Sequence, residues 1–197
     1  MTPTIAQTIT FSSQSVGAEP ADFDTWRTGS GGPARWIVVR DESAQGGMAV
    51  EQVSQETADY RFPLAIYKPF DGLNVEVQTR FKPVSGRVDQ AGGIAARLTT
   101  PDDYYIVRAN ALEDNVRFYR VVKGQRQQLK SANTKVASNE WHTLALKAEG
   151  ERFTITFDGK TLYSVTDKTF AKAGKVALWT KSDSVTRFDR LDIKALP

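Results

Sequence analysis

The stretch GIAARLTTPDDYYIVRANALEDNVRFY, residues 93–119, decides the fold, because it predicts three consecutive antiparallel strands. Thr100–Asp103 has the composition of a type I turn, with proline at its second position. A second hairpin turn is expected over Leu112–Asn115. Period-two alternation then gives these strands one apolar and one polar face. The apolar face is expected to hold Leu98 opposite Tyr105, Ala96 opposite Val107, Ile94 opposite Ala109, and also Phe118 and Val122.

The polar face of the three strands carries the groups that the sequence offers for ligand binding. Above the small residues Gly93 and Ala95 it presents guanidinium, amide and phenol groups, those of Arg97, Arg108, Asn110, Arg117 and Tyr119. Three arginines on one face repel one another unless an anion lies between them. Guanidinium groups pair bidentately with carboxylates, so an acidic sugar such as a uronate would fit. Alternatively the arginines pair with Glu76, Glu113 or Asp114, and the face is an ordinary solvated sheet surface.

Composition places the chain among globular proteins and removes several classes of function. The chain has 197 residues, of which 40% are hydrophobic and 25% charged, and it is treated as one domain over residues 1–197. Residues 1–10 are expected to be disordered or to form an edge strand. A formal net charge of +3 is too small and too scattered for nucleic-acid binding. Without cysteine there are no disulfides and no thiolate metal sites, and no apolar run is long enough to span a membrane. The oligomeric state stays open.

Strand and turn signals recur along the whole chain at the spacing typical of a sandwich or barrel. Short helical turns are expected only at Ser54–Tyr60 and Lys168–Ala173. We count about ten to twelve strands, and this pattern predicts an all-β fold, a two-sheet antiparallel β-sandwich of the jelly-roll type. The strands that alternate most clearly are Ala34–Arg40, Leu73–Lys82, Trp141–Ala148, Arg152–Phe157, Lys160–Val165, Gly174–Lys181 and Thr186–Lys194.

Four motifs in the second half of the chain resemble one superfamily. They are Asn139–Leu144 (NEWHTL), Phe157–Lys160 (FDGK), Gly174–Thr180 (GKVALWT) and Phe188–Ile193 (FDRLDI). In this order they resemble the concanavalin A-like lectin/glucanase superfamily, and most closely its 3-keto-disaccharide hydrolase-like and laminin-G-like branches. The resemblance spans about residues 70–195. It implies a jelly roll whose concave sheet carries a ligand, commonly a carbohydrate, in a protein exported to the periplasm or secreted. The start of the sequence shows no leader, so either a leader has been removed or the protein is cytoplasmic.

An enzymatic reading of the same resemblance would make the protein a glycoside hydrolase or lyase. Glycosidases need two carboxylates, and the best-placed acids here are Glu76 and Asp183. The glucanase pattern E-x-D-x-x-E is absent, and at Gln90–Arg97 only the glycine and the arginine match the hydrolase-like branch. We therefore expect a lectin-like domain outside the cytoplasm that binds a glycan, including acidic ones, in the concave groove. The alternatives are a glycoside-cleaving enzyme of the 3-keto-disaccharide hydrolase type and a laminin-G-like module that binds a protein.

The remaining candidates are an aromatic residue, a lysine, a histidine and one acid. Trp179 is expected to stack on a sugar ring, with Lys181 beside it as a further ligand contact. His142 is the only histidine, which excludes a His-rich metal site, and we expect it on the surface, on the face opposite Leu144. No cofactor is required. The resemblance does imply a structural Ca²⁺ in many members, for which Asp189 is the candidate ligand, although one acid does not define such a site.

Overall fold

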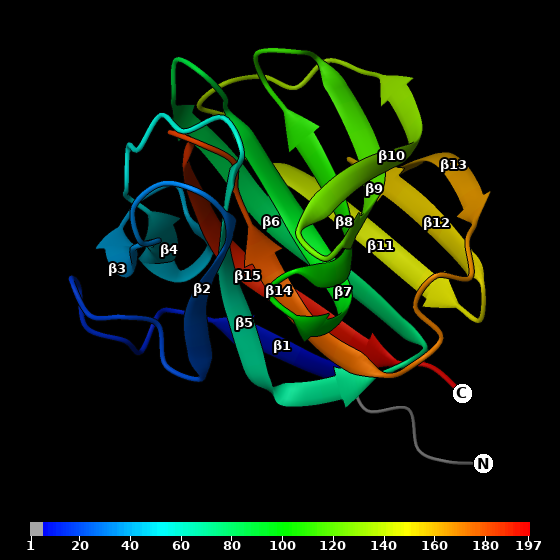
Figure 1. The fold of residues 1–197 in the computed structure, drawn as a ribbon. Helices are drawn as coiled ribbons and strands as arrows, with labels where there is room; N and C mark the ends of the chain where they lie inside the picture. Colours follow the sequence, from blue (N-terminus) through cyan, green and yellow to red (C-terminus); the bar gives the residue numbers. More distant parts are fainter. Residues whose placement is uncertain (1–5) are drawn as a thin grey trace.

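The computed structural model describes residues 6–197, which form two antiparallel sheets packed face to face (Figure 1). The first strand, β1 (Ala6–Thr10), pairs with the last, β15 (Val185–Ala195), so the two ends of the described chain lie side by side. The predicted two-sheet antiparallel sandwich is confirmed.

The order in the first sheet, sheet A, is β13 (Lys160–Thr166), β12 (Arg152–Phe157), β11 (His142–Glu149), β6 (Val75–Ser85), β15 (Val185–Ala195), β4 (Met48–Gln52) and β3 (Trp36–Arg40), with β1 (Ala6–Thr10) also on β15. The order in sheet B is β10 (Gln125–Asn133), β9 (Asn115–Val122), β8 (Asp103–Asn110), β7 (Ala91–Thr100), β14 (Gly174–Trp179), β5 (Arg61–Gly72) and β2 (Phe23–Gly29).

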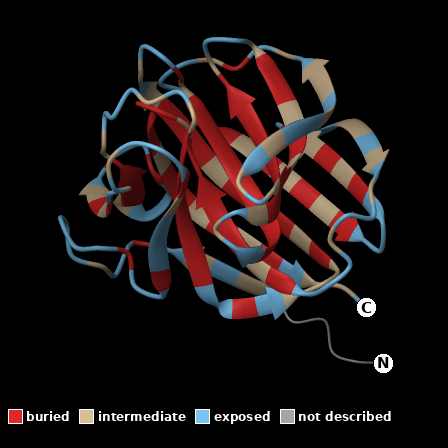
Figure 2. Ribbon diagram, in the orientation of Figure 1, coloured by how far each residue is buried: buried red, intermediate tan, exposed pale blue. Residues whose placement is uncertain are grey.

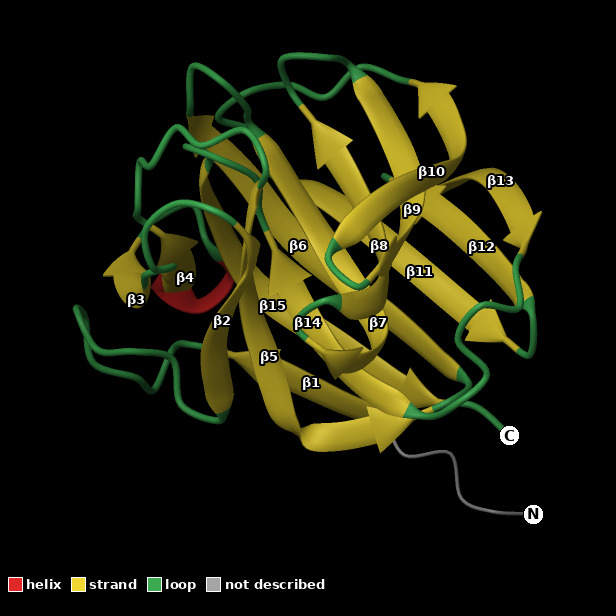
Figure 3. Ribbon diagram, in the orientation of Figure 1, coloured by secondary structure: helices red, strands yellow, loops and turns green. Residues whose placement is uncertain are grey.

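Helix is almost absent, as Figure 3 shows. Within residues 6–197 the only helical element is the 3-10 turn Gln45–Gly47. The helical turns expected at Ser54–Tyr60 and Lys168–Ala173 are wrong, because both segments are irregular loops. The edge-strand expectation for residues 1–10 applies to Ala6–Thr10, which forms β1, while the first five residues lie outside the described part.

The main core lies between the two sheets, where alternate residues of both inner faces interdigitate (Figure 2). β11 shows the pattern clearly, since its residues alternate between buried and half-buried along the strand. Its inward side chains belong to one apolar cluster with those of β6, β9, β12 and β15. The largest fully buried side chains of this core are Trp36, Tyr105, Phe11, Phe81, Phe118 and Phe153.

A second apolar cluster lies on the other face of sheet B, the face that the sequence predicted to be polar. β8 is buried on both faces, so Tyr104 and Ile106 face this cluster while their neighbours face the main core. The cluster consists of Phe62, Leu64, Ile66, Ala91, Ala95, Leu98, Tyr104, Ile106, Tyr119, Val121, Ala177 and Trp179.

Sheet B covers this second cluster by curling on itself. The Thr28 hydroxyl on β2 lies 2.7 Å from the Tyr104 hydroxyl on β8, although three strands separate β2 and β8 in the sheet order. Arg126 on β10 places its guanidinium 4.4 Å from the ring centre of Tyr119 and 4.8 Å from that of Phe62. Figure 1 shows β10 curving across the front of β8 and β9. The predicted open groove is therefore filled over much of its length.

The register of the first hairpin differs from the prediction by a bulge. Ile94 pairs with Val107 and Ala96 with Tyr105, whereas Thr100 pairs with Asp103. Between the last two pairs, residues 97–99 of β7 face the single residue Tyr104 of β8. Arg97 adopts a φ of +51°, in the left-handed region that non-glycine residues rarely occupy. The bulge turns the Arg97 side chain away from the face on which the sequence placed it.

Candidate functional site

Arg97 lies apart from the other two predicted arginines. Its guanidinium is buried against the Phe153 ring in the main core, with the guanidinium carbon 5.0 Å from the ring centre. It donates hydrogen bonds to three backbone carbonyls, at 2.9 Å to Leu73, 2.9 Å to Phe170 and 2.5 Å to Gly150. The expected place of Arg97 beside Arg108 is thus wrong, because the bulge redirects it to tie three loops together at the edge of the sandwich.

The other two arginines do share a face, and a carboxylate lies between them. Arg108 on β8 is paired in register with Arg117 on β9. Glu113, from the turn between these strands, accepts from Arg108 at 2.8 Å and lies 3.0 Å from Arg117. Burial raises the pKa of Glu113, but Arg108, Asn115 and Arg117 together outweigh burial and hold it below its ordinary value. We call Arg108, Glu113, Asn115, Arg117 and Tyr119 the arginine cluster.

The arginine cluster is mostly buried. Arg108 also donates to the Asn115 side chain and, at 3.3 Å, to the Tyr119 hydroxyl. Only Glu113 and Arg117 reach solvent, with 38% and 33% of their side chains exposed. Arg108 and Arg117 thus pair with Glu113, as the alternative to ligand binding predicted. The anion expected between the arginines is a carboxylate of the protein itself.

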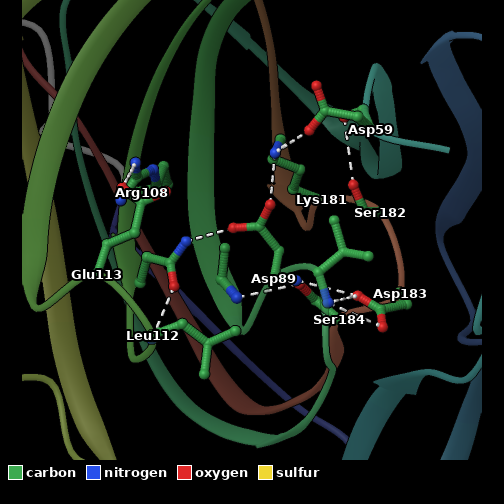
Figure 4. A network of polar contacts seen from close by, with 12 residues as sticks. Asp59, Asp89, Arg108, Leu112, Glu113, Lys181, Ser182, Asp183 and Ser184 are labelled. Carbon is green, nitrogen blue, oxygen red and sulfur yellow. Dashed lines mark hydrogen bonds and ion pairs between the residues drawn. The ribbon is translucent and has the colours of Figure 1, made fainter. Parts of the chain in front are cut away.

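A second set of polar groups continues from this cluster along the same end of sheet B (Figure 4). Lys181, just after β14, places its ammonium between the carboxylates of Asp59, at 2.7 Å, and Asp89. Asp89 in turn accepts from the Asn110 amide, whose oxygen accepts from the Leu112 backbone N–H at 2.9 Å. We call Asp59, Asp89, Asn110 and Lys181 the polar row.

The polar row runs from buried to exposed groups. Asp89 and Asn110 are buried, whereas 80% of the Asp59 side chain is exposed. Burial lowers the pKa of Lys181, but hydrogen bonds and charge from both aspartates outweigh burial and raise it, so the ammonium stays charged. The hydrogen bond from Lys181 lowers the pKa of Asp59. Two of the predicted ligand contacts, Asn110 and Lys181, are thus brought together with two aspartates that the sequence did not single out.

Trp179, the predicted stacking platform, is completely buried. It stacks on Phe62 with ring centres 5.3 Å apart, and its indole N–H points to the Tyr104 hydroxyl at 3.4 Å. The exposed tryptophan of this domain is Trp26 on β2. Sequence reasoning missed it because FDTWRTG shows no clean alternation that would place its indole.

The two carboxylates named for an enzyme do not form a pair. Glu76 on β6 stands on the outer surface of sheet A, in register between Lys147 and Lys194. Asp183 lies at the end of sheet B and accepts backbone N–H groups from Arg87 at 2.7 Å, Val88 at 3.1 Å and Asp89 at 3.0 Å. Its carboxylate therefore holds the 86–89 loop in place.

His142 and Asp189 both have structural partners. His142 is buried rather than exposed, on the same face of β11 as Leu144, because residues two apart in a strand share a face. It stacks on Phe157, with Nδ1 2.8 Å from Asp158 Oδ2 and Nε2 3.0 Å from the Ala137 carbonyl.

Asp189 is buried, and burial raises its pKa. Its Oδ2 accepts from Arg80 and, at 2.7 Å, from the Gln45 N–H. Among residues 6–197 no three histidine or acidic side chains lie close enough together to hold a metal ion. Ca²⁺ binding at Asp189 therefore stays a prediction, and no further acidic ligands for it are found in this part of the chain.

An eight-stranded and a seven-stranded antiparallel sheet, the second of which curls over its own apolar cluster, define a lectin-like β-sandwich domain. The sequence profile of the family described as "Galactocerebrosidase, C-terminal lectin domain" matches residues 73–196, and the chain belongs to this family. The resemblance to the concanavalin A-like superfamily is thereby confirmed. No curated protein matches the chain. Within the described residues, no helix is both long and apolar enough to cross a membrane.

Solved structures share the fold at low sequence identity. The carbohydrate binding module CBM66 from Bacillus subtilis is 21% identical, with a TM-score of 0.61 over 71% of this chain and 83% of that one. A protein of unknown function from Shewanella oneidensis is 18% identical, with a TM-score of 0.62 over 98% and 86%. Domain 4 of an extracellular GH43 arabinanase from Geobacillus stearothermophilus, solved with arabinotriose, is 14% identical, with a TM-score of 0.58 over 95% and 90%. These likenesses show the fold.

Proposed function

We propose that this domain binds a glycan at the polar row and the exposed rim of the arginine cluster. The observation that carries the proposal is the Lys181 ammonium, held between Asp59 and Asp89 at the end of sheet B. Sugar hydroxyls both donate and accept hydrogen bonds, and a ligand site orients them with a few fixed polar groups. Asp59, Glu113 and Arg117 are the members of this surface that solvent reaches most readily.

Glu113 favours a neutral glycan over an acidic one. It already compensates the charges of Arg108 and Arg117, so an added carboxylate would have to displace it. Alternatively, the carboxylate of a bound uronate takes the place of the Glu113 carboxylate between Arg108 and Arg117.

Two of the similar structures support binding of a carbohydrate outside the cytoplasm. One is a carbohydrate binding module, and the other is a domain of an extracellular arabinanase. We propose a periplasmic or secreted location on this ground. Fractionation of the source cells, with an antibody to the domain, tests it. Recovery of the protein only from the cytosol would contradict it.

The test of glycan binding uses calorimetry with a panel of neutral and uronate-containing oligosaccharides. Lys181→Met should weaken binding at least about tenfold, which corresponds to about 1.4 kcal/mol. Lys147→Met, at a half-exposed lysine on sheet A, is the matched control and should bind as the wild type does. Asp59→Ala removes an exposed carboxylate without disturbing the core, so it remains informative if Lys181→Met fails to fold. Unchanged affinity in both Lys181→Met and Asp59→Ala would refute the proposed site.

The enzymatic and protein-binding readings have less support in the structure. Glu76 lies near the start of β6, whereas Asp183 binds the loop that follows the end of that strand. About ten strand residues, roughly 30 Å, therefore separate the two acids, which is too far for an acid/base pair on one glycosidic bond. In residues 6–197 the exposed large hydrophobic side chains are Val16, Trp26, Val88 and Leu112, which come from four different segments. Such scattered residues are ordinary on a soluble domain and make no docking patch.

A further inference from the structure

The free strand edges of the sandwich are places where another chain can pair, because backbone N–H and C=O groups along an edge have no partner. In sheet A these edges lie on β1, β3 and β13, and in sheet B they lie on β2 and β10. Proteins protect such edges with short strands, bulges, lysines or a covering loop. Four of the five edges carry a protection of this kind, and β2 does not.

The protected edges differ in how they are blocked. β1 is only five residues long. On the open side of β3, the Val38 N–H donates to the Ala18 carbonyl and the Val38 carbonyl accepts from Gly17, at 2.8 Å each, so a loop covers this edge. β10 and β13 each contain a register shift, and each exposes a lysine, Lys130 and Lys160.

β2 has none of these protections. Its seven residues pair with β5 in one continuous register from Phe23 to Gly29, without a bulge. The strand FDTWRTG contains no lysine and no proline, and its aromatic and threonine residues favour an extended conformation. β2 lies at the end of sheet B opposite β10 (Figure 1). Within residues 6–197 this edge is therefore the one most open to a further strand.

Backbone groups of alternate β2 residues point to the open side. The Lys68 N–H donates to the Asp22 carbonyl at 2.9 Å, and this pair continues the register of β2 with β5. Even-numbered residues of β2 therefore direct their N–H and C=O groups to β5, and odd-numbered residues direct theirs outward. The Phe23 N–H is bonded to the carbonyl of a preceding turn. Within residues 6–197, the backbone groups of Thr25 and Arg27 have no hydrogen-bond partner.

The space next to this edge is not filled by the chain. A hollow of about 440 Å³ lies there, lined by residues 25–27 and by Gly31, Pro33 and Ala34. The Trp26 side chain stands on the opposite face of the sheet from those of its two neighbours, and it is 53% exposed. An incoming strand thus finds free backbone partners, room beside them and a large apolar side chain to bury.

We propose that the incoming strand is β2 of a second copy of this chain, paired antiparallel across a two-fold axis, so that the two B sheets become one. The axis makes the two edges identical, and each then supplies the partners that the other lacks. Asp24 lies in the first half of β2 and Arg27 in the second, so antiparallel pairing brings the acidic half of each strand beside the basic half of the other. The contact is made by backbone groups and needs no extended apolar patch.

Three registers centred on residues 25–27 pair odd-numbered residues with each other, and the free groups distinguish them. With Thr25 opposite Thr25, the Arg27 carbonyl meets Phe23, whose N–H is already used. With Arg27 opposite Arg27, two like charges face each other, which is unfavourable. With Thr25 opposite Arg27, all free groups of both residues are paired. Trp26 then lies opposite Trp26 at the axis, in a non-hydrogen-bonded pair with Cα atoms about 4.5 Å apart.

The test measures the mass of the full chain by analytical ultracentrifugation, from low micromolar to millimolar concentration. The wild type should shift from 21.8 kDa towards twice that mass as its concentration rises. Thr25→Pro removes an outward N–H and no bond to β5, and proline is tolerated on edge strands, so the dissociation constant of the dimer should rise at least about tenfold. Thr25→Ala, which keeps the N–H, is the matched control and should dimerise as the wild type does.

Variants at Trp26 keep the test informative if Thr25→Pro fails to fold. Trp26→Lys places two ammonium groups opposite each other and should weaken the dimer to a similar extent. Leu112→Lys, at a similarly exposed residue on the β8–β9 turn, should leave the dimer unchanged.

Cross-linking tests the register, because the chain has no cysteine of its own. Trp26→Cys should form a covalent dimer when it is oxidised with copper phenanthroline, since Cα atoms about 4.5 Å apart lie within disulfide range. Thr25→Cys should not, because its Cα lies opposite Arg27 and too far from its own symmetry mate.

Three outcomes would contradict the proposal. A wild type that keeps a mass of 21.8 kDa at every concentration overturns the dimer, and β2 is then left for an extended segment of a different protein. A dimer that survives both Thr25→Pro and Trp26→Lys overturns β2 as the interface. Cross-linking of Thr25→Cys in place of Trp26→Cys overturns the register.

Discussion

Arg97 shows how much of this fold depends on one charged side chain. A buried guanidinium without a carboxylate partner is costly, and here three backbone carbonyls compensate it. Arg97→Ala leaves those carbonyls of Leu73, Gly150 and Phe170 without their donor. We expect the free energy of unfolding to fall by about 3 kcal/mol, measured by urea denaturation. Arg117→Ala, at a partly exposed arginine, should cost less than about 1 kcal/mol. Equal losses in the two variants would contradict the role of Arg97.

Asp183 predicts a pH dependence of stability. Burial raises its pKa, but the N–H groups of Arg87, Asp89 and Val88 outweigh burial and lower it below the ordinary value. A lowered pKa in the folded state means that the stabilisation is present above the unfolded-state pKa of about 3.9 and is lost as the pH falls through the folded-state pKa.

Asp183→Asn should therefore reduce the free energy of unfolding at pH 7 by about 2 kcal/mol. The difference from the wild type should narrow as the pH falls below about 4. Urea denaturation between pH 3 and pH 7 measures both effects. Glu140→Gln, at an exposed carboxylate before β11, is the control. A difference that stays constant over the whole pH range would show that Asp183 does not act through its charge.

At the level of elements, β10 determines what kind of face sheet B presents. Its sequence QRQQLKSAN is almost entirely polar, yet it covers an apolar cluster through the Arg126 guanidinium, which lies over Phe62 and Tyr119. The Arg126 backbone N–H also donates a hydrogen bond to the Tyr60 hydroxyl, which anchors this end of β10. A polar strand thus acts as a cover because long basic side chains can pack along their apolar stems.

Arg126→Ala should uncover part of this cluster. We expect a loss of about 1 kcal/mol in stability, from two cation–π contacts, and an increase in acrylamide quenching of the otherwise buried Trp179. Lys130→Ala, at an exposed basic residue of the same strand, should change neither quantity. If Arg126→Ala leaves both the stability and the quenching at wild-type values, β10 does not protect the cluster.

The same elements show what the sequence could predict. Strands with regular alternation, such as 75–81 and 152–157, were located within a few residues, because one solvated face makes the period of two visible. β8 is buried on both faces, so its alternation could not distinguish a polar groove from a second core. The bulge at Arg97 depends on contacts with Leu73, Gly150 and Phe170, which lie far away in the chain and leave no local signal. The polar row joins residues from four segments, and sequence reasoning found Asn110 and Lys181 but missed Asp59 and Asp89.

At the level of the whole molecule, the formal net charge of +3 is small, and Glu113 compensates the arginine cluster. Little positive charge is therefore left to attract an acidic ligand. Exposed charges are screened within about 8 Å at physiological salt, so binding that depends on net charge weakens steeply as salt increases. We expect glycan affinity to change less than about twofold between 50 mM and 500 mM NaCl, measured by calorimetry.

Glu113→Gln gives this prediction a matched test, because it removes the anion between Arg108 and Arg117 and keeps the side chain's size. The variant should gain affinity for uronate-containing oligosaccharides at low salt, and that gain should disappear at 500 mM NaCl. Its affinity for neutral oligosaccharides should stay close to that of the wild type if the Lys181 end of the surface makes the main contacts. A wild-type preference for acidic glycans with a steep salt dependence would mean that the ligand displaces Glu113, and that the arginine cluster, not the polar row, dominates recognition.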